Sequence, residues 1–208
     1  DWTRRWTAGF RYDRARFAPA DTALVGPLPD DRTLALPYMR LDLLQDDYVT
    51  AHNLDQIGRT EDLRFGTQLS AELGVSQAAL GANRNAFVAS LGASRGYRLV
   101  HEQSLFLAGS WGSRLEGGSL RDSLLSVSSR YFWRASGKTV LFVGFAADKG
   151  SALDLDHELM LGGDTGLRGY PLRYQTGTAR ALLTVEGRYF TNWYPLRLAR
   201  VGAAVFAD

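Results

Sequence analysis

The sequence of 208 residues contains no cysteine and has almost no net charge. Without thiols, disulfide bonds and zinc or iron–sulfur sites built on thiolates are excluded. The 24 basic and 22 acidic residues leave a formal charge of +2, which gives no field that would attract nucleic acid. The aromatic residues also do not alternate with basic clusters, as a platform for stacked bases requires. We therefore expect no nucleic-acid partner.

Long apolar runs and helical periodicity are missing as well. No segment approaches the ~20 consecutive apolar residues of a transmembrane helix, and none keeps apolar residues at a sustained helical period. A strand that crosses a membrane within a β-barrel needs only about 9–11 residues of alternating polarity. The missing runs therefore argue against a helical membrane protein and leave a membrane β-barrel open.

Most of the chain instead alternates between apolar and polar residues, with turn residues between the alternating segments. In residues 64–75, Phe65, Leu69 and Leu73 share one face, whereas Gln68 and Glu72 lie on the other. The segments expected as strands are 5–16, 36–44, 64–75, 86–98, 104–113, 124–134, 138–147, 180–190 and 197–208. Successive strands at short spacing predict an antiparallel meander of nine or ten strands.

Alternation alone does not separate a soluble β-sandwich from a barrel in a membrane. Two features favour the barrel. Many expected strands have ten or more residues, against the usual five or six, and aromatic residues gather near strand ends, as in the girdles of membrane barrels. These residues are Trp2, Trp6, Tyr97, Trp111, Tyr131, Trp133, Tyr189, Trp193 and Tyr194. We expect an all-β fold in which the meander forms part of a transmembrane β-barrel, with a proline-rich loop at 19–31.

Residues 161–177 are glycine-rich and longer than a turn requires, and loops of such length usually have a function or are disordered. Within them, LGGDTGLRGYP (161–171) resembles the signature of the Omp85 superfamily of outer-membrane barrels, the bacterial surface antigens that include BamA-like and TamA-like proteins. In that family a long extracellular loop with an Arg-Gly-Tyr or Arg-Gly-Phe motif folds back into the barrel lumen. The matching residues are Arg168, Gly169 and Tyr170, preceded by a turn at Gly163, Asp164 and Gly166. The strands that follow, 178–190 and 197–208, resemble the family too.

Alternation predicts partners for the arginine of this motif. Glu186 and Arg188 fall on one face of the strand at 180–190, and Asp208 falls on the same face of the next strand. Arg168 could therefore reach between Glu186 and Asp208. A charge-assisted hydrogen bond of this kind contributes about 1.5–3 kcal/mol when it is well made. We expect residues 150–178 to form a lumenal loop that these side chains hold in place.

Other residues of the loop have expected roles as well. Gly166 and Gly169 flank the arginine and would allow the backbone to turn tightly. Tyr170 is expected to pack into the interior as an aromatic wedge with a polar tip. Asp164 is expected to stabilise its own turn through an Asx-type hydrogen bond.

The resemblance implies that residues 1–208 are one partial barrel domain of a protein in the bacterial outer membrane. Periplasmic POTRA domains would belong to the same protein and are not part of this sequence. The implied function is the insertion or translocation of polypeptides, by pairing of client strands with a sheet edge. The implied partners are outer-membrane lipid or lipopolysaccharide and a client β-barrel or secreted polypeptide. Alternatives are the membrane anchor of a patatin-like phospholipase, a passive pore and a soluble β-protein.

Two short motifs resemble those of enzymes. The Asp-Thr-Gly triplet at 164–166 matches aspartic proteases, which need a second copy that this sequence lacks. The GASRG segment at 92–96 matches a nucleophile elbow, with Asp122 or Asp148 and then His157 in a suitable chain order. An elbow requires a strand–turn–helix context, whereas strand is expected on both sides of this segment. We expect no catalytic activity and no cofactor.

The three histidines, His52, His101 and His157, lie far apart in the sequence. Their spacing matches no common zinc-site pattern. We therefore expect no metal site and place these histidines in loops or at strand ends.

Overall fold

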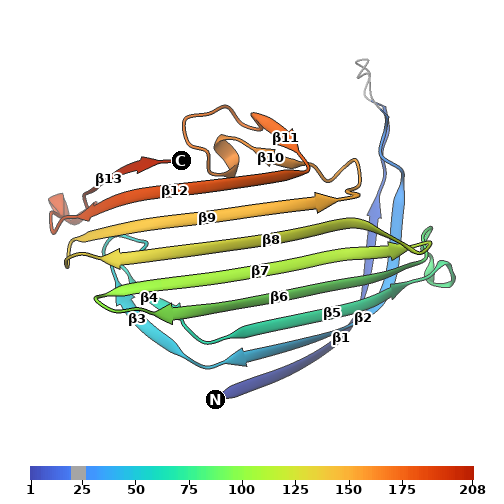
Figure 1. The fold of residues 1–208 in the computed structure, drawn as a ribbon, viewed down its shortest axis with the longest axis horizontal. Helices are drawn as coiled ribbons and strands as arrows, with labels where there is room; N and C mark the ends of the chain where they lie inside the picture. The colour runs from blue at the N-terminus through green and yellow to red at the C-terminus, as the bar shows by residue number, and fades with distance from the viewer. Residues whose placement is uncertain (20–26) are drawn as a thin grey trace.

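The structure is a computed structural model that describes residues 1–19 and 27–208. It contains an antiparallel sheet of nine strands in the order β1-β2-β5-β6-β7-β8-β9-β12-β13, in which each strand pairs with the next strand of this sheet along the chain (Figure 1). The strands are β1 (Trp2–Ala15), β2 (Arg32–Gln45), β5 (Gln68–Ser76), β6 (Ala86–Arg98), β7 (Gln103–Glu116), β8 (Ser119–Arg134), β9 (Thr139–Ser151), β12 (Ala179–Phe190) and β13 (Gly202–Ala207). The expected all-β fold and the antiparallel meander are confirmed. Within the described residues, β1 and β13 each pair with one neighbour and form the two edges of the sheet.

Two small hairpins accompany this sheet. One pairs β3 (Tyr48–His52) with β4 (Thr60–Arg64) and lies between β2 and β5 in the chain; the other pairs β10 (Leu159–Leu161) with β11 (Gln175–Gly177). Helical structure in the described part of the chain is limited to 3-10 turns at Ala78–Leu80, Gly163–Thr165 and Pro195–Arg197. None of the helices there has the length and apolarity needed to span a membrane.

The register between strands gives the sheet two chemically different faces. On β12, residues with exposed and part-buried side chains alternate from Ala179 to Glu186. Val185 pairs with Val143 of β9 on one face, and Glu186 pairs with Phe142 on the other. We call the face of Glu186 the inner face, because the β3–β4 hairpin and the segment after β9 pack against it. The opposite face is the outer face.

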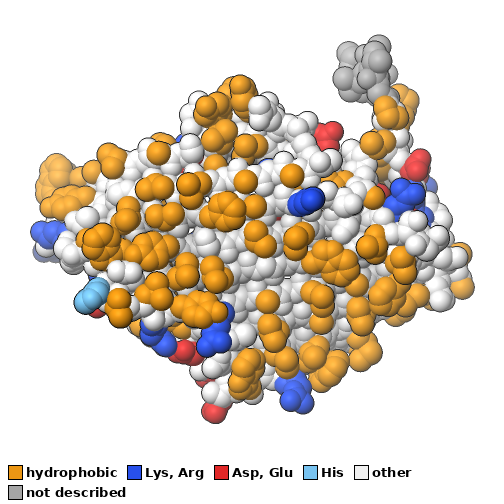
Figure 2. All heavy atoms as spheres, in the orientation of Figure 1, with side chains coloured by type: hydrophobic (Ala, Val, Ile, Leu, Met, Phe, Trp, Pro, Cys, Tyr) orange, Lys and Arg blue, Asp and Glu red, His pale blue; other side chains and the backbone are white. Residues whose placement is uncertain are grey.

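Large apolar side chains cover the outer face and remain exposed there. They occur on every strand of the sheet and include Trp6, Phe10, Met39, Leu73, Phe87, Leu91, Leu107, Leu125, Val127, Phe145, Leu183, Val185 and Val205. Figure 2 shows apolar side chains spread over a broad area of the surface. On the outer face of the paired segments of β5 to β12, the charged residues are Arg95 and Lys149. Both lie near strand ends, so the middle of this face is apolar.

The main apolar core lies on the inner face beneath the β3–β4 hairpin. Its buried members are Ala51, Leu54, Phe132, Val140 and Phe190, with Ile57, Leu63, Phe106 and Phe142 packed against them. The rings of Phe132 and Phe142 lie 5.1 Å apart between centroids. This core explains why the segment at 138–147 is apolar on both faces. One face is exposed, and the other covers the hairpin.

Two of the expected strands are only partly correct. The strand expected at 64–75 is interrupted, because the backbone N–H groups of Phe65 and Gly66 donate to the carbonyl oxygen of Asp47. Phe65 therefore lies in the interior and not on the outer face with Leu69. The strand expected at 197–208 begins only at Gly202, after the 3-10 turn at Pro195–Arg197. The loop expected at 19–31 lies partly outside the described residues.

Candidate functional site on the inner face

Arg168 lies between the carboxylate of Glu186 on β12 and that of Asp208, the residue directly after β13. Its Nε and Nη2 atoms donate to the two carboxylate oxygens of Asp208 at 2.9 and 2.8 Å, and its Nη1 donates to Oε2 of Glu186 at 3.0 Å. Its backbone N–H also donates to Asp208, at 3.0 Å. The Asp208 side chain is only 3% exposed, whereas that of Arg168 is 35% exposed. The contact that alternation predicts is therefore present.

Two further side chains complete the surroundings of this arginine. The Thr184 hydroxyl donates to Asp208 at 2.9 Å. The ring of Phe206 lies 3.5 Å from the guanidinium carbon of Arg168, which is a cation–π contact. The hydrogen bonds from Arg168 to Asp208 raise the pKa of Arg168 above its usual value. The guanidinium is therefore charged under all physiological conditions.

Glycines shape the loop that delivers Arg168. Gly166 and Gly169 have φ angles of 104° and 86°, a backbone region that residues with a Cβ rarely adopt. The Thr165 hydroxyl accepts from the N–H of Gly162 at 2.8 Å and closes the preceding 3-10 turn. The N–H of Gly163 donates to the carbonyl of Pro171 at 3.0 Å, which brings the two arms of the loop together.

The structure corrects two expectations for this loop. Asp164 does not form an Asx-type bond within its own turn; it accepts from the N–H of Arg173 at 3.1 Å, nine residues further along the chain. Tyr170 is not a buried wedge, because it is 50% exposed and packs on Tyr174 with ring centroids 5.2 Å apart. Both residues brace the loop against itself and do not enter the interior of the protein.

Arg188 extends the same group of charges toward the β3–β4 hairpin. Its Nε donates to Oε1 of Glu186 at 2.9 Å, and its Nη1 donates to Asp55 at 2.8 Å and to the carbonyl of Leu54 at 3.1 Å. We call Arg168, Glu186, Arg188, Asp208 and Asp55 the Arg168 cluster. Glu186 is its centre, because each of its two oxygens accepts from a different arginine. The partnership with Asp55 was not expected from the sequence, because 133 residues separate it from Arg188.

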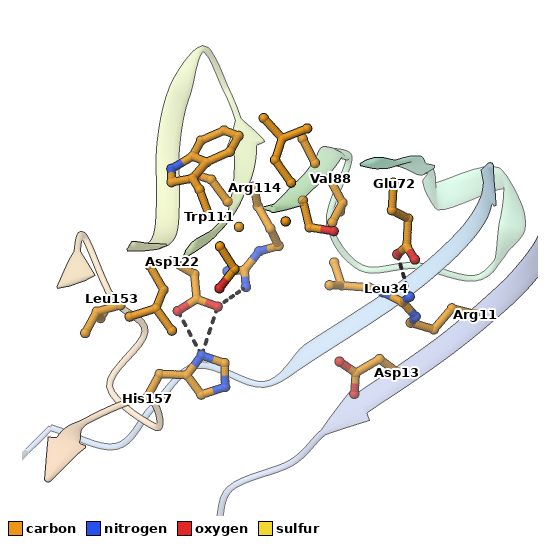
Figure 3. Close-up of a pocket in the computed structure, with 18 of the residues that line it drawn as sticks. Arg11, Asp13, Leu34, Glu72, Val88, Trp111, Arg114, Asp122, Leu153 and His157 are labelled. Atoms are coloured by element: carbon orange, nitrogen blue, oxygen red, sulfur yellow. Dashed lines mark hydrogen bonds and ion pairs between the residues drawn. The ribbon is translucent and has the colours of Figure 1, made fainter. Parts of the chain in front are cut away.

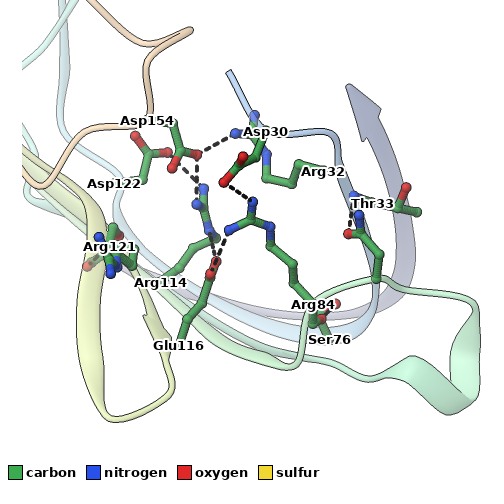
Figure 4. A network of polar contacts seen from close by, with 12 residues as sticks. Asp30, Arg32, Thr33, Ser76, Arg84, Arg114, Glu116, Arg121, Asp122 and Asp154 are labelled. Carbon is green, nitrogen blue, oxygen red and sulfur yellow. Dashed lines mark hydrogen bonds and ion pairs between the residues drawn. The ribbon is translucent and has the colours of Figure 1, made fainter. Parts of the chain in front are cut away.

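A second ionic network lies at the end of the sheet where the segment after β9 begins (Figure 4). Arg114 of β7 donates to Glu116 at 2.7 Å, to Asp122 at 3.0 Å and to Asp154 at 2.7 Å. Arg32 of β2 contacts Asp154 and also donates to Asp156 at 3.0 Å. Both arginines are buried. The network therefore ties residues 154–156 to β2, β7 and β8.

The carboxylate of Asp156 is stabilised in its charged form. Burial alone would raise the pKa of Asp156, but the hydrogen bond and charge of Arg32 outweigh burial and lower it below its usual value. We call residues 152–178, between β9 and β12, the long loop. The Arg32–Asp156 pair holds the beginning of the long loop in place, and the Arg168 cluster holds its tip.

A cavity of about 770 Å³ borders this network on the inner face (Figure 3). Residues of β1, β2 and β5 to β8 line it together with residues 153–159, so the sheet curves around it. His157 Nδ1 lies 2.8 Å from a carboxylate oxygen of Asp122 in this cavity. Ligand atoms of Asp122, Asp154 and His157 lie within 4.8 Å of one another, although the sequence spacing did not indicate a metal site. The guanidinium of Arg114 already bonds both aspartates, and its charge opposes a cation there.

The geometry does not support a serine nucleophile at the GASRG segment. These residues lie inside β6, with strand on both sides, where Ser94 pairs with Gln68 and Ala108. Asp122 and His157 do come together, but Ser94 lines a different cavity from theirs. The strand–turn–helix context of a nucleophile elbow is missing at Ser94.

Comparison of the chain with protein-family models, curated proteins and solved structures finds no match.

Proposed function

We propose that this sheet is part of a transmembrane β-barrel of the Omp85 type in the bacterial outer membrane, within a protein that inserts or translocates β-rich polypeptides. The observation that carries the proposal is the return of the Arg168 loop onto the polar inner face of a sheet whose outer face is apolar and exposed. The ion pairs of Arg168 also support the proposal, because its partners, Glu186 on β12 and Asp208 directly after β13, both lie on that face.

The outer face supports a membrane environment. In a soluble β-sandwich, the apolar face of one sheet packs against a second sheet about 10 Å away. Here, large apolar side chains are exposed on the outer face of all nine strands. Contiguous exposed apolar surface marks a membrane or a protein interface. A charge-free middle with an apolar surface is what the lipid-facing side of a barrel requires.

The polar residues of the inner face support its assignment as the wall of a barrel lumen. It carries serines and ion pairs such as that of Arg180 with Asp148, at 2.6 Å. A barrel interior is polar in the same way. Backbone that is not part of the barrel sheet, such as much of residues 152–178, is tolerated at membrane depth only where it lies within protein or lines a water-filled space. The Arg168 cluster provides such a position for the tip of the loop.

The proposed activity involves no bond chemistry in this chain. Client strands pair through their backbone with a free sheet edge, as in other strand-addition complexes. The Arg168 cluster holds the loop against β12 and β13, and so keeps this part of the barrel in one geometry while clients are added. The residues in this role are Arg168, Glu186, Arg188 and Asp208.

The test is an insertion assay with the full-length protein in lipid vesicles. An unfolded outer-membrane barrel is added, and its folded fraction is followed over time by its heat-modifiable electrophoretic mobility. We expect faster folding than in protein-free vesicles, and a smaller acceleration with Arg168→Ala. Equal client folding rates with and without a correctly folded protein would exclude the assembly function.

A further inference from the structure

The β3–β4 hairpin crosses the inner face from β6 to β13. At one side, the N–H of Gly96 on β6 donates to the carbonyl of Phe65 at 3.1 Å. In the middle, Ala51 and Leu54 are buried against Phe132 and Val140 of β8 and β9. At the far side, Ile57 lies close to Gly202 of β13: a Cβ added to Gly202 would be 3.2 Å from the Cδ1 atom of Ile57. The hairpin therefore spans six of the nine strands.

The turn of this hairpin has a defined shape. The Glu61 carboxylate accepts from the backbone N–H groups of Leu54, Asp55 and Gln56, at 3.2, 3.0 and 2.6 Å. Three donors on one carboxylate hold residues 54–56 in the conformation that presents Leu54 to the core and Asp55 to Arg188. A segment arranged in this way is a fitted part of the inner face and not a loose connection.

The hairpin and the long loop approach the inner face from opposite ends. β9 runs from the side of the hairpin to the side where the long loop leaves the sheet, as Figure 1 shows. The core beneath the hairpin includes Val140, near the first residue of β9, and the long loop follows the last residue of β9, Ser151. A path of charges links the two segments: Arg168 and Arg188 share Glu186, and Arg188 donates to Asp55 of the hairpin turn.

We infer that the β3–β4 hairpin is a plug of the barrel lumen, and that its seating is coupled to the Arg168 loop through Glu186. This inference rests on the proposed barrel and goes beyond it by adding a gate. The coupling follows from the charges of the Arg168 cluster, which has two arginines and three carboxylates. When Arg168 withdraws, the cluster as the described residues form it keeps Arg188 as its cation beside Asp55, Glu186 and Asp208.

Withdrawal of the loop thus changes the balance of forces on Arg188. Glu186 and Asp208 lose the cation that neutralised them, and their attraction for Arg188 increases. As a result, the contacts of Arg188 to Asp55 and to the Leu54 carbonyl weaken. Coupling between two sites is reciprocal, so a displaced hairpin also loosens the loop. A client that binds the loop would open the lumen from the opposite end.

The experiment uses the absence of native cysteines. Ala51 is 6% exposed in the core beneath the hairpin, so the single substitution Ala51→Cys reports whether the hairpin is seated. The rate of labelling by a hydrophilic maleimide is measured in the full-length, detergent-folded protein, in four backgrounds: no further change, Arg168→Ala, Glu186→Gln and Arg180→Ala. Arg180 is the matched control, because it is an arginine of β12 whose hydrogen bonds go to Asp148 and to the Met160 carbonyl of the long loop, and so it contacts that loop without using Glu186.

We expect Arg168→Ala to raise the labelling rate about tenfold, a typical factor for coupled sites, and Arg180→Ala to leave it unchanged. Glu186→Gln should lower the rate, because Arg188 is then no longer drawn from Asp55 toward Glu186; a raised rate in Glu186→Gln would overturn the coupling. Glu186→Gln keeps the shape of the side chain, so it serves if Arg168→Ala fails to fold. Equal rates in all four backgrounds would overturn the coupling. In planar bilayers, Arg168→Ala should also raise the ion conductance over that of Arg180→Ala. Equal conductance would overturn the plug. Client insertion is not used as a readout, so failure of the assembly function would leave these results interpretable.

Discussion

The substitution Arg168→Ala removes the centre of the contact between the long loop and the sheet. It deletes three side-chain hydrogen bonds, two to Asp208 and one to Glu186. It leaves Asp208 with the Thr184 hydroxyl and one backbone N–H, and leaves Glu186 with Arg188. The two carboxylates therefore keep some partners but lose most of their neutralising charge.

The size of the effect can be worked out from this geometry. Loss of one partner from a buried ion pair costs about 3–5 kcal/mol, whereas an exposed pair contributes about 0–1 kcal/mol. The Asp208 side chain is nearly fully buried, but the Arg168 side chain is 35% exposed, so solvent screens part of the interaction. We expect a loss of about 2 kcal/mol in the free energy of unfolding, which lies between these two ranges. Arg168→Lys keeps the charge but not the forked geometry, and should lose about half of that.

The assay is urea unfolding in detergent micelles, followed by tryptophan fluorescence and by heat-modifiable mobility. A matched control is Arg173→Ala, which removes the side chain of another arginine of the same loop, whereas the contact of Arg173 to Asp164 uses its backbone N–H. An unfolding midpoint of Arg168→Ala equal to that of Arg173→Ala would refute the reasoning, because the ionic contact would then contribute nothing to stability.

Three other predictions concern the fold. Gly66→Ala should destabilise the protein by about 1–3 kcal/mol through overpacking, because its Cβ would lie 2.0 Å from a backbone oxygen of β2, whereas Gly137→Ala has open space and should be neutral in the same urea titration. Leu183→Lys should cost about 2–4 kcal/mol in lipid vesicles if this outer-face position faces lipid, against about 0.5 kcal/mol or less at a water-exposed site. Because Arg32 lowers the pKa of Asp156, the stability from this pair is present above about pH 4, the usual carboxyl range, and is lost as the pH falls. Asp156→Asn should therefore lower the urea midpoint at neutral pH but not in strong acid.

Alternation made much of the sheet predictable. The segment at 180–190 contains residues of opposite polarity at successive positions, and its parity places Glu186 and Arg188 together on the inner face, where the structure has them. The same reasoning placed Asp208 next to Glu186. These predictions succeed because the side-chain period of a strand is two, so one well-marked residue determines the face of its neighbours.

The hairpin was not predicted, because its contacts are between residues far apart in the chain. Its two strands have only five residues each, and the alternating segment that follows begins close to Arg64. The aromatic residues at inner positions, Phe106, Phe132 and Phe142, were a usable signal. Apolar side chains on an otherwise polar face indicate that another element covers them, and here the hairpin does so. The identity of that element depends on tertiary packing, which periodicity does not encode.

The most direct test of the account compares two adjacent residues of β8. Val127 lies on the outer face and is 43% exposed, whereas Ser128 lies on the inner face and lines a cavity there. Each is replaced by cysteine in the cysteine-free, full-length protein, labelled with an environment-sensitive fluorophore and reconstituted in vesicles. The account predicts that brominated lipid quenches the label at 127, and that iodide in the water quenches the label at 128. Quenching of both labels by iodide, with no effect of brominated lipid at 127, would contradict a lipid-facing outer surface.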